Sequence, residues 1–312
     1  MAQCCQTLNL YKSIMNTVKL IGEALKELGE DLGRRNSVDN GFNKMAGIET
    51  GFTDLDRVTS GMRPGSLIVI ASRPSMGKTT FALNIASHVS VNSKLPVLMF
   101  SMDHSSIGIA SRLASQIGEI EMYKLRTGEM DESDKVKLNF AFEKLMDAPL
   151  YIDETPAQSI HEIINKSREV ISNNGRLGLI VIDNLQLMMF MNEEDNKPEE
   201  VTNVMSSLNS LARETDTPII ILSQLNQKLE MRRNKRPRIS DLPDRMIGQY
   251  SDLLMFLYRD EVYEPDSQSQ GTAEIIIGRH RYGSIGMIAL GSVKLKFGEF
   301  SNFESIHAAS KQ

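Results

Sequence analysis

The sequence of 312 residues has little of several features that would assign it to a particular class of protein. Its two cysteines, Cys4 and Cys5, are adjacent, so they are poor candidates for a structural disulfide and lack the spacing of a metal site. No stretch approaches the roughly 18 consecutive apolar residues of a membrane span. Charged residues interrupt the apolar positions of residues 1–30, where a signal peptide would lie. We therefore expect an intracellular protein in a reducing compartment.

An excess of positive charge is also missing. The chain has 35 Lys and Arg against 40 Asp and Glu, a formal net charge of −5, which argues against a generally basic nucleic-acid-binding surface. Any contact with DNA must therefore come from a local cationic surface. No internal repeat or low-complexity tract is visible. The 41% of hydrophobic and 24% of charged residues fit a folded protein with a sizeable core.

The first part of the chain differs in pattern from the rest. Between about residues 10 and 33, apolar residues recur at helical spacing with Lys and Glu between them, which predicts an amphipathic helix. Gly33 and the polar run 36–41 break this pattern and indicate a hinge. We therefore divide the chain into an N-terminal segment with this helix, 1–45, and a second domain, 46–312. The helix packs either on its own domain or on a neighbour.

From about residue 47 the pattern alternates between strands and helices. Apolar runs predict strands at 67–71, 97–101, 150–152, 179–182, 219–222, 253–257 and 273–277, and helical segments lie at 105–117, 131–146, 159–173 and 198–215. Near-continuous apolar runs are typical of strands that are buried on both faces of a parallel sheet. Residues 283–286 predict a terminal hairpin that closes one edge of the sheet. The expected fold class is α/β, with a largely parallel central sheet flanked by helices.

The segment from Ser72 to Thr80 carries the most functional information. It follows an apolar strand and precedes an apolar-periodic helix, which is the setting of a phosphate-binding loop in a nucleotide-hydrolysing enzyme. Backbone N–H groups in such a loop point at phosphate oxygens, Lys78 reaches the β- and γ-phosphates, and the Thr79 hydroxyl holds Mg²⁺. The predicted nucleotide-binding residues are Ser72, Arg73, Pro74, Ser75, Met76, Gly77, Lys78, Thr79 and Thr80, with Ser72 in place of the usual first Gly. The alternative, a chance loop with a surface lysine, is disfavoured by the flanking strand and helix.

Polar residues follow three other predicted strands. Asp183 comes directly after 179–182, where a phosphate-loop ATPase carries the acidic partner of Mg²⁺. Asp103 follows 97–101, and its carboxylate can orient or deprotonate the attacking water. Gln224 follows 219–222 and is a candidate sensor of the γ-phosphate. The alternatives are helix capping for Asp103 and Asp183 and an ordinary polar strand end for Gln224.

Two groups of basic residues lie later in the chain. Arg279 and Arg281 follow the strand at 273–277 and, two residues apart, point the same way. They are candidates for arginine fingers that act in the nucleotide site of the next subunit, and a surface basic pair is the alternative. The densest basic run, 232–238, includes Arg232 and Arg233 and either contacts nucleic-acid phosphates or forms a solvated face.

With these residues assembled, the chain resembles the C-terminal motor of the DnaB family of replicative helicases, within the RecA-like ATPases. The resemblance runs from about Gly47 to Phe303. The matching stretches, in order, are Gly47–Asp56, Arg73–Thr79, Leu125–Gly128, Ile182–Asp183, Leu185–Met188, Ser223–Asn226, Lys235–Pro237, Ser240–Leu242 and Tyr258–Tyr263. So many ordered matches are far more specific than one phosphate loop.

The resemblance implies a RecA-like domain that works in a homo-hexameric ring, hydrolyses ATP or another nucleoside triphosphate with Mg²⁺, and translocates 5′–3′ on single-stranded DNA. It implies that Lys78 and Thr79 hold phosphate and metal, Asp183 supports the metal, Gln224 senses the γ-phosphate, and Arg281 acts in trans. The N-terminal helix is similar to the family's linker helix.

A helicase loader and a primase are the further implied partners, with no membrane. The expected location is the cytoplasm of a bacterial cell, or of the host cell for a viral protein. The family's N-terminal collar domain is absent from this sequence, which indicates a short homologue or a truncated form.

The chain departs from the family pattern at several of these positions. Asp103 stands where the family has its catalytic Glu, in a Ser-Leu-Glu-Met context, and Arg279 stands where it has Lys. In the family's central DNA loop, Pro243 replaces the Arg. Asp244 keeps the acidic character of the next position, and Arg245 compensates if the loop shifts by one residue, so both are candidate DNA-binding residues.

Three functions remain to be compared. The first is an active helicase motor that hydrolyses nucleotide at subunit interfaces. The second is a catalytically weakened subunit that regulates a helicase ring, which the departures at Asp103 and Pro243 favour. The third is a RecA-like recombinase or clock-type ATPase, which the stretches Ser223–Asn226 and Tyr258–Tyr263 disfavour. The helicase motor is preferred because the loop, the metal acid, the sensor and the arginine pair are all present.

Overall fold

The computed structural model describes residues 46–189, 198–294 and 297–302, together with residues 21, 22, 25, 26 and 29. Most of the predicted N-terminal helix, the hinge at 36–41 and the adjacent cysteines lie outside the described residues. The chain divides into two units, Met1–Ala46 and Gly47–Gln312, and the following description concerns the second.

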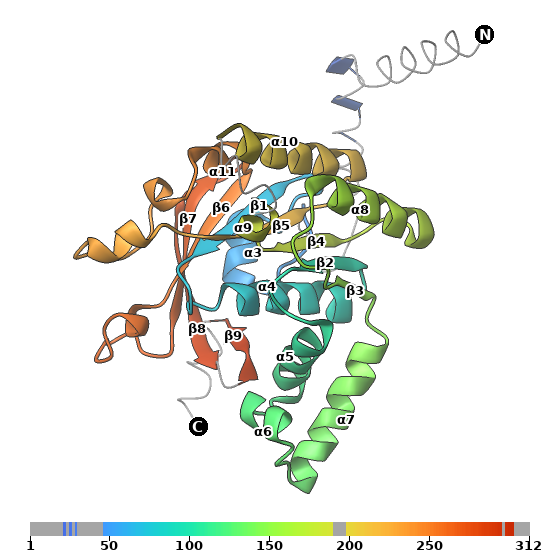
Figure 1. The fold of residues 1–312 in the computed structure, drawn as a ribbon, viewed down its shortest axis with the longest axis vertical. Coiled ribbons are helices and arrows are strands. Elements are labelled where there is room, and N and C mark those ends of the chain that lie inside the picture. The colour runs from blue at the N-terminus through green and yellow to red at the C-terminus, as the bar shows by residue number, and fades with distance from the viewer. Residues whose placement is uncertain are drawn as a thin grey trace. The chain divides into compact units, whose positions relative to one another are not determined.

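In the described part of the chain, the strands form one sheet in the order β3-β2-β4-β5-β1-β6-β7-β8-β9 (Figure 1). The strands are β1 Leu67–Ser72, β2 Val97–Ser101, β3 Leu150–Asp153, β4 Leu179–Asp183, β5 Ile219–Gln224, β6 Leu253–Tyr258, β7 Ala273–His280, β8 Gly286–Lys294 and β9 Glu299–Ser301. The neighbouring pairs from β3 to β6 are parallel, whereas β7, β8 and β9 are added antiparallel. The predicted α/β fold, the largely parallel sheet and the terminal hairpin are thus confirmed.

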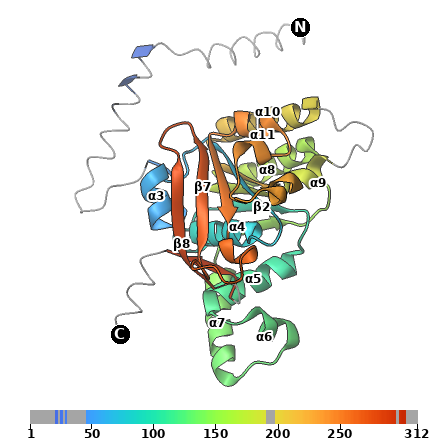
Figure 2. The same ribbon diagram turned by 90° about the vertical axis from the view of Figure 1, so that its left-hand side faces the viewer.

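Helices cover both faces of the sheet. The α-helices are α3 Thr53–Thr59, α4 Lys78–Ser87, α5 Ser106–Gly118, α6 Met122–Thr127, α7 Glu132–Met146, α8 Ile160–Asn174, α9 Leu185–Met189, α10 Pro198–Thr215 and α11 Arg245–Tyr250. A π-helical turn, η1 His88–Asn92, continues α4, and short 3₁₀ turns lie at η2 Gln227–Met231, η3 Ile239–Asp241 and η4 Asp260–Val262. Figures 1 and 2 show α8, α10 and α11 on one side of the sheet and α3, α4 and α5 on the other. Among the described residues, no helix combines the length and apolar character needed to cross a bilayer.

The central strand β1 shows why the sheet is buried on both faces. Every residue of β1 is buried, and its side chains alternate between two cores. Ile68 and Ile70 belong to the core beneath α3, α4 and α5, whereas Leu67 and Val69 belong to the core beneath α8, α10 and α11. A strand covered by helices on both faces needs apolar residues at every position. This explains the continuous apolar runs in the sequence.

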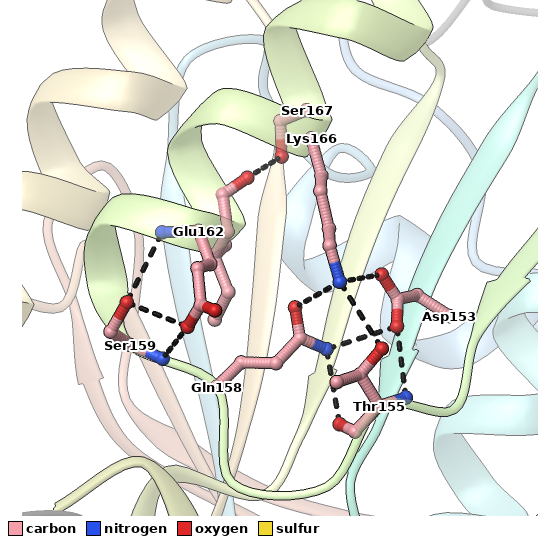
Figure 3. Close-up of polar contacts among 8 residues, drawn as sticks. Asp153, Thr155, Gln158, Ser159, Glu162, Lys166 and Ser167 are labelled. Carbon is pink, nitrogen blue, oxygen red and sulfur yellow. Dashed lines mark hydrogen bonds and ion pairs between the residues drawn. The ribbon is translucent and has the colours of Figure 1, made fainter.

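Local hydrogen bonds define where several helices begin. Asp131 begins α7 and Ser159 begins α8, each in a reciprocal capping box with the residue three positions on. Figure 3 shows the second box, in which Glu162 accepts from the N–H and the hydroxyl of Ser159. The same view shows Lys166 of α8 in an ion pair of 2.6 Å with Asp153, the last residue of β3. This network ties the carboxyl end of an edge strand to the helix that follows it.

Candidate nucleotide-binding site

The loop between β1 and α4 leaves the first backbone N–H groups of α4 without a side-chain cap. Gly77 occupies the N-cap position with φ of 94° and makes no capping hydrogen bond. A β-carbon at Gly77 would lie 2.7 Å from the Phe300 ring, so glycine is required both for the left-handed backbone and for the close approach of β9. Uncapped N–H groups at a helix start form an anion-binding position. The predicted phosphate loop therefore has the backbone that phosphate binding needs.

This loop opens into a cavity of about 320 Å³. The strand order places β2, β4, β5 and β1 side by side and parallel, so their carboxyl ends meet at one edge of the sheet. The cavity is lined by Arg73, Pro74, Ser75, Gly77, Lys78, Thr79, Thr80, Asp103, Arg112, Asp183, Asn184 and Gln224. Most of the predicted loop residues and all three polar strand-end residues are thus brought together. Ser72 and Met76 are instead buried beneath the loop.

A larger cavity of about 530 Å³ lies beside the end of α4 and contains none of the predicted site residues.

Thr79 and Asp183 are in direct contact. The Thr79 hydroxyl donates a hydrogen bond of 2.9 Å to Oδ2 of Asp183. Burial raises the pKa of the Asp183 carboxyl, and the Thr79 hydrogen bond and the charge of Lys78 oppose this rise. Burial also lowers the pKa of the Lys78 ammonium, against the charges of Asp183 and Asp103. Helix capping by Asp183 is not observed, since Asn184 instead accepts from the N–H of Leu187.

Asp103 lies on the rim of the cavity, and 61% of its side chain is exposed. It does not cap the next helix, because the hydroxyl of Ser105 accepts from the N–H of Gly108 at the start of α5. The capping alternative for Asp103 is therefore wrong. Its carboxylate lines the same cavity as Lys78 and Asp183. Its negative charge acts to raise the pKa of both groups.

Gln224 ends β5 with an exposed side chain, and its backbone is held by Gln186 of α9. The Gln224 N–H donates to Oε1 of Gln186 at 3.1 Å, and Nε2 of Gln186 donates to the Gln224 carbonyl at 3.2 Å. The same amide nitrogen also donates to the Ser223 hydroxyl. This clamp links the strand end that carries Asp183 to the one that carries Gln224.

Sequence reasoning missed several residues of this site. Arg112 of α5 lines the cavity. The one sequence signal for it is its position on the helix that follows Asp103. Arg259 is buried behind the loop, where it donates to the Ser75 carbonyl and pairs with Glu261. Arg73, predicted to bind nucleotide, donates hydrogen bonds to Glu230 and to the Leu225 carbonyl.

The predicted arginine pair lies at the opposite end of the strands. β7 runs antiparallel to β6, and Arg279 pairs with Leu254 near the start of β6. The rise along β1 from Leu67 to Ser72 is about 16 Å at roughly 3.3 Å per residue. Arg281 forms an ion pair with Asp252, which contacts Leu67 at the start of β1. The two arginines are therefore far from the phosphate loop of their own chain. Arg279 donates to the carbonyls of Gly248 and Gln249 at 2.6 and 2.8 Å.

The predicted DNA-binding residues fall into two kinds of environment. Asp244 is the N-cap of α11 and accepts from the N–H of Met246 at 2.6 Å. Arg232 is paired with Asp241 at 2.7 Å. Arg245 and Arg233 are exposed. The two exposed arginines remain candidates for DNA contact, whereas Asp244 and Arg232 also have structural partners within the chain.

Residues 47–304 match the family described as DnaB-like helicase C terminal domain. The chain belongs to this family. Over 274 residues it is 42% identical to the replicative DNA helicase DnaB of Pasteurella multocida (strain Pm70), which covers 86% of this chain and 58% of that protein. The corresponding protein of Geobacillus stearothermophilus is 41% identical over 267 residues, covering 85% of this chain and 58% of the relative. This DnaB-family chain thus spans a little more than half the length of these relatives.

Solved structures agree with the family assignment. One of them, an ATPase domain, superimposes with a TM-score of 0.84 at 33% identity, covering 91% of this chain and 99% of that domain. A DnaB-like replicative helicase, whose structure describes its interactions with primase, gives a TM-score of 0.81 at 32% identity, covering 96% of this chain and 76% of that one. The RadB recombinase shares the fold alone, with a TM-score of 0.54 at 16% identity. The RecA-like fold and the DnaB resemblance are therefore confirmed.

Proposed function

We propose that this DnaB-family chain is the ATP-hydrolysing motor of a replicative DNA helicase. The observation that carries the proposal is the convergence of the phosphate loop, Asp103, Asp183 and Gln224 on one cavity. In this proposal, residues 46–312 are the motor and residues 1–45 contain a linker helix. The preferred substrate is ATP or another nucleoside triphosphate, and the site of action is the cytoplasm.

The donors at the site fit Mg²⁺. Thr79 and Asp183 offer a hydroxyl and a carboxylate oxygen, and Mg²⁺ keeps its other ligands as water and substrate phosphates. Among the described residues there is no cluster of His, Cys, Asp and Glu that would cage a metal unaided, which suits an ion that arrives with the nucleotide. When bound, the ion neutralises charge on the β- and γ-phosphates.

The chain's own residues would do the remaining work of hydrolysis. The uncapped N–H groups of α4 and Lys78 bind the phosphates, and Arg112 adds a positive charge on the cavity wall. A water oxygen bonds to the γ-phosphorus while the bond from that phosphorus to the β–γ bridging oxygen breaks and ADP leaves. Asp103 takes one proton from the water. Gln224, on its Gln186 clamp, contacts the γ-phosphate and responds to its loss.

The opposite placement of Arg281 supports assembly into a ring. An arginine at the end of the sheet opposite its own phosphate loop is placed to serve a neighbouring site rather than its own. We infer a homo-hexamer in which each Arg281 stabilises charge on the nucleotide of the adjacent subunit. In this ring, Arg279 lies beside Arg281 and binds the end of α11 through the carbonyls of Gly248 and Gln249. The segment around Arg245, together with Arg233, contacts single-stranded DNA during 5′–3′ translocation. A helicase loader and a primase are the further proposed partners.

The test measures ATP turnover with and without single-stranded DNA, together with nucleotide affinity. Lys78→Ala should lose both binding and turnover, whereas Arg281→Ala should lose turnover by about 1,000-fold and keep binding within about 3-fold. The matched control is Arg176→Ala, because Arg176 forms an exposed pair with Asp216 and does not line the cavity. Normal nucleotide binding without DNA stimulation would favour a regulatory subunit instead.

A mixing experiment tests whether sites are shared. When Lys78→Ala and Arg281→Ala subunits are combined, some interfaces join an intact phosphate loop to an intact Arg281. Partial recovery of turnover is expected. Complete absence of recovery in rings that contain both variants would reject the trans role of Arg281.

A further inference from the structure

His104 has a buried ring nitrogen that lacks a hydrogen-bond partner among the described residues. The atom is Nδ1, and it lies 3.5 Å from Oδ2 of Asp103. This separation is longer than an N–H to oxygen hydrogen bond, which is normally about 2.7–3.2 Å. A buried polar atom without a partner is uncommon in a folded protein and requires an explanation. The neighbouring carboxylate of Asp103 is a group that this nitrogen can reach.

The backbone around the two residues is tightly held. The Ser101 hydroxyl donates to the His104 carbonyl at 2.7 Å and accepts from the His104 N–H at 3.3 Å. The Met102 N–H donates to the Asp183 carbonyl at 2.8 Å. These bonds fix the turn after β2 to the strand that carries Asp183. What they leave free is the Asp103 side chain, which is 61% exposed on the cavity rim.

We propose that His104 is a positioning residue for Asp103, whose carboxylate accepts a hydrogen bond from the His104 Nδ1–H and is thereby held over the γ-phosphate position. The inference rests on the proposed function, because it assigns a task to Asp103 in hydrolysis. The His104 Nδ1 and the Asp103 Oδ2 need to approach by less than about 1 Å to form this hydrogen bond. Catalytic hydrogen bonds are often long before substrate binds and tighten in the complex.

The physical need for such a partner follows from the length of aspartate. Its carboxylate reaches one methylene less far than that of glutamate, so fewer of its rotamers bring an oxygen to a bound water. An exposed carboxylate samples several rotamers, and a misplacement of about 1 Å can reduce turnover by about 100-fold. A ring N–H held by a rigid turn restricts the carboxylate to one orientation. The arrangement corresponds to a general base oriented by a third group.

The kinetic test is a double-mutant cycle between positions 103 and 104. His104→Leu removes the ring nitrogen and keeps an apolar side chain in the partly buried space, while His104→Asn keeps a donor near the position of Nδ1. We expect His104→Leu to reduce kcat by about 10-fold to 100-fold with nucleotide affinity unchanged, and His104→Asn to recover most of the loss. Asp103→Glu carries the carboxylate beyond the ring. In that background, His104→Leu should cost less than about 3-fold.

A second readout needs no hydrolysis. The chain has five histidines, so nitrogen NMR of histidine-labelled protein can assign the His104 ring by its loss in His104→Asn. We expect a proton on Nδ1 and a shift of this resonance alone in Asp103→Asn. A ring with its proton on Nε2 and a bare Nδ1 would overturn the proposal. Equal losses from His104→Leu in the unsubstituted protein and in Asp103→Glu would also overturn it, since they would indicate a purely structural effect.

Failure of the inference and failure of the proposed function give different results. If Asp103→Asn keeps full turnover, Asp103 is not the base, and the proposed mechanism fails together with the inference. If Asp103→Asn is inactive and His104→Leu is fully active, only the inference fails. Thermal unfolding of each variant establishes that the fold is intact before turnover is compared.

Discussion

Arg281 and Asp252 form an ion pair of 2.7 Å at the end of the sheet opposite the phosphate loop. Asp252 is buried directly before β6, and its Oδ2 also accepts a hydrogen bond of 2.9 Å from the N–H of Leu67. The Arg281 N–H donates to the Asp252 carbonyl at 2.8 Å. The arginine that we propose to act on a neighbouring subunit is therefore held by its own chain between the starts of β1 and β6.

This arrangement predicts different costs for two substitutions of Asp252. Asp252→Asn keeps an acceptor for the Leu67 N–H but places an amide nitrogen where an oxygen pairs with Arg281, so it loses this ion pair and the unfolding free energy should fall by about 1 kcal/mol. Asp252→Ala also leaves a buried N–H unsatisfied and should cost about 3 kcal/mol. Urea denaturation of both variants measures the difference. Equal costs would show that the Leu67 hydrogen bond contributes little.

The contact between Thr79 and Asp183 predicts a pH dependence of metal-assisted binding. Burial raises the pKa of Asp183, so at low pH this carboxyl carries a proton and loses its ability to bind a cation. Mg²⁺-dependent nucleotide affinity should therefore fall as pH decreases toward that pKa and return as pH increases. Thr79→Val removes a hydrogen bond that lowers the pKa of Asp183, so the fall should begin at higher pH and affinity at neutral pH should drop about 10-fold.

The controls for this titration lie in the same chain. Asp183→Asn should bind nucleotide weakly at every pH, with a flat profile. Thr215→Val removes a hydroxyl that donates to carbonyls of its own helix, α10, and it should leave the profile unchanged. A Thr79→Val profile that matches the unsubstituted protein would contradict the assignment of Thr79 and Asp183 to the metal.

The Asp153 network shown in Figure 3 predicts a stability effect with a defined pH range. Burial would raise the pKa of Asp153, but hydrogen bonds from Lys166 and Thr155 outweigh it and hold the pKa below its ordinary value. The stabilisation is therefore present above the pKa of Asp153 in the unfolded chain and is lost as pH falls through the folded-state pKa. Asp153→Asn should lower the unfolding free energy at pH 7 by about 1 kcal/mol after allowance for solvent screening.

Denaturation at pH 7, 5 and 3 provides the measurement. The difference between Asp153→Asn and the unsubstituted protein should be constant from pH 7 to 5 and shrink toward pH 3. Lys135→Met, which removes an exposed pair with Glu132, serves as the control and should have little effect at any pH. A difference that grows on acidification would contradict the sign of the pKa shift.

The cap at α11 separates a structural role from DNA binding. Asp244→Ala should destabilise the protein by about 1 kcal/mol, while Asp244→Asn, which also accepts at an N-cap, should cost much less. Arg245→Ala should leave stability unchanged and weaken single-stranded DNA binding, with a salt dependence reduced by about 0.7 in log–log slope. Fluorescence anisotropy at several salt concentrations measures this slope. Loss of DNA affinity in Asp244→Asn at full stability would show that Asp244 itself contacts DNA.

Much of the fold was predictable because its signals are local. The seven predicted strands are all present, and each begins at the residue expected. Their ends were less predictable: β7 continues to His280, so Arg279 lies within the strand and not after it. The strand continues because antiparallel pairing with β6 reaches Arg279 and His280. Cross-strand pairing of this kind is not encoded in the local sequence.

The candidate site divides in the same way. The phosphate loop and the strand-end acids were identified from the sequence because a turn between an apolar strand and a helix has few alternatives. Gln186, Arg112 and Arg259 were missed because each reaches its partner from a different element. Long side chains of this kind are mostly surface residues, so their presence alone carries no signal.

The sequence by itself determined the α/β class, the phosphate loop and the DnaB resemblance, since apolar periodicity and glycine placement act over a few residues. Only the tertiary structure decided which polar groups meet. It placed Asp103, Asp183 and Gln224 around Lys78 because parallel strands bring their carboxyl ends together. It placed Arg281 at the opposite end of the sheet, in an ion pair with Asp252, because β7 runs antiparallel to β6. Strand direction is set by packing across the whole sheet, and no short stretch of sequence specifies it.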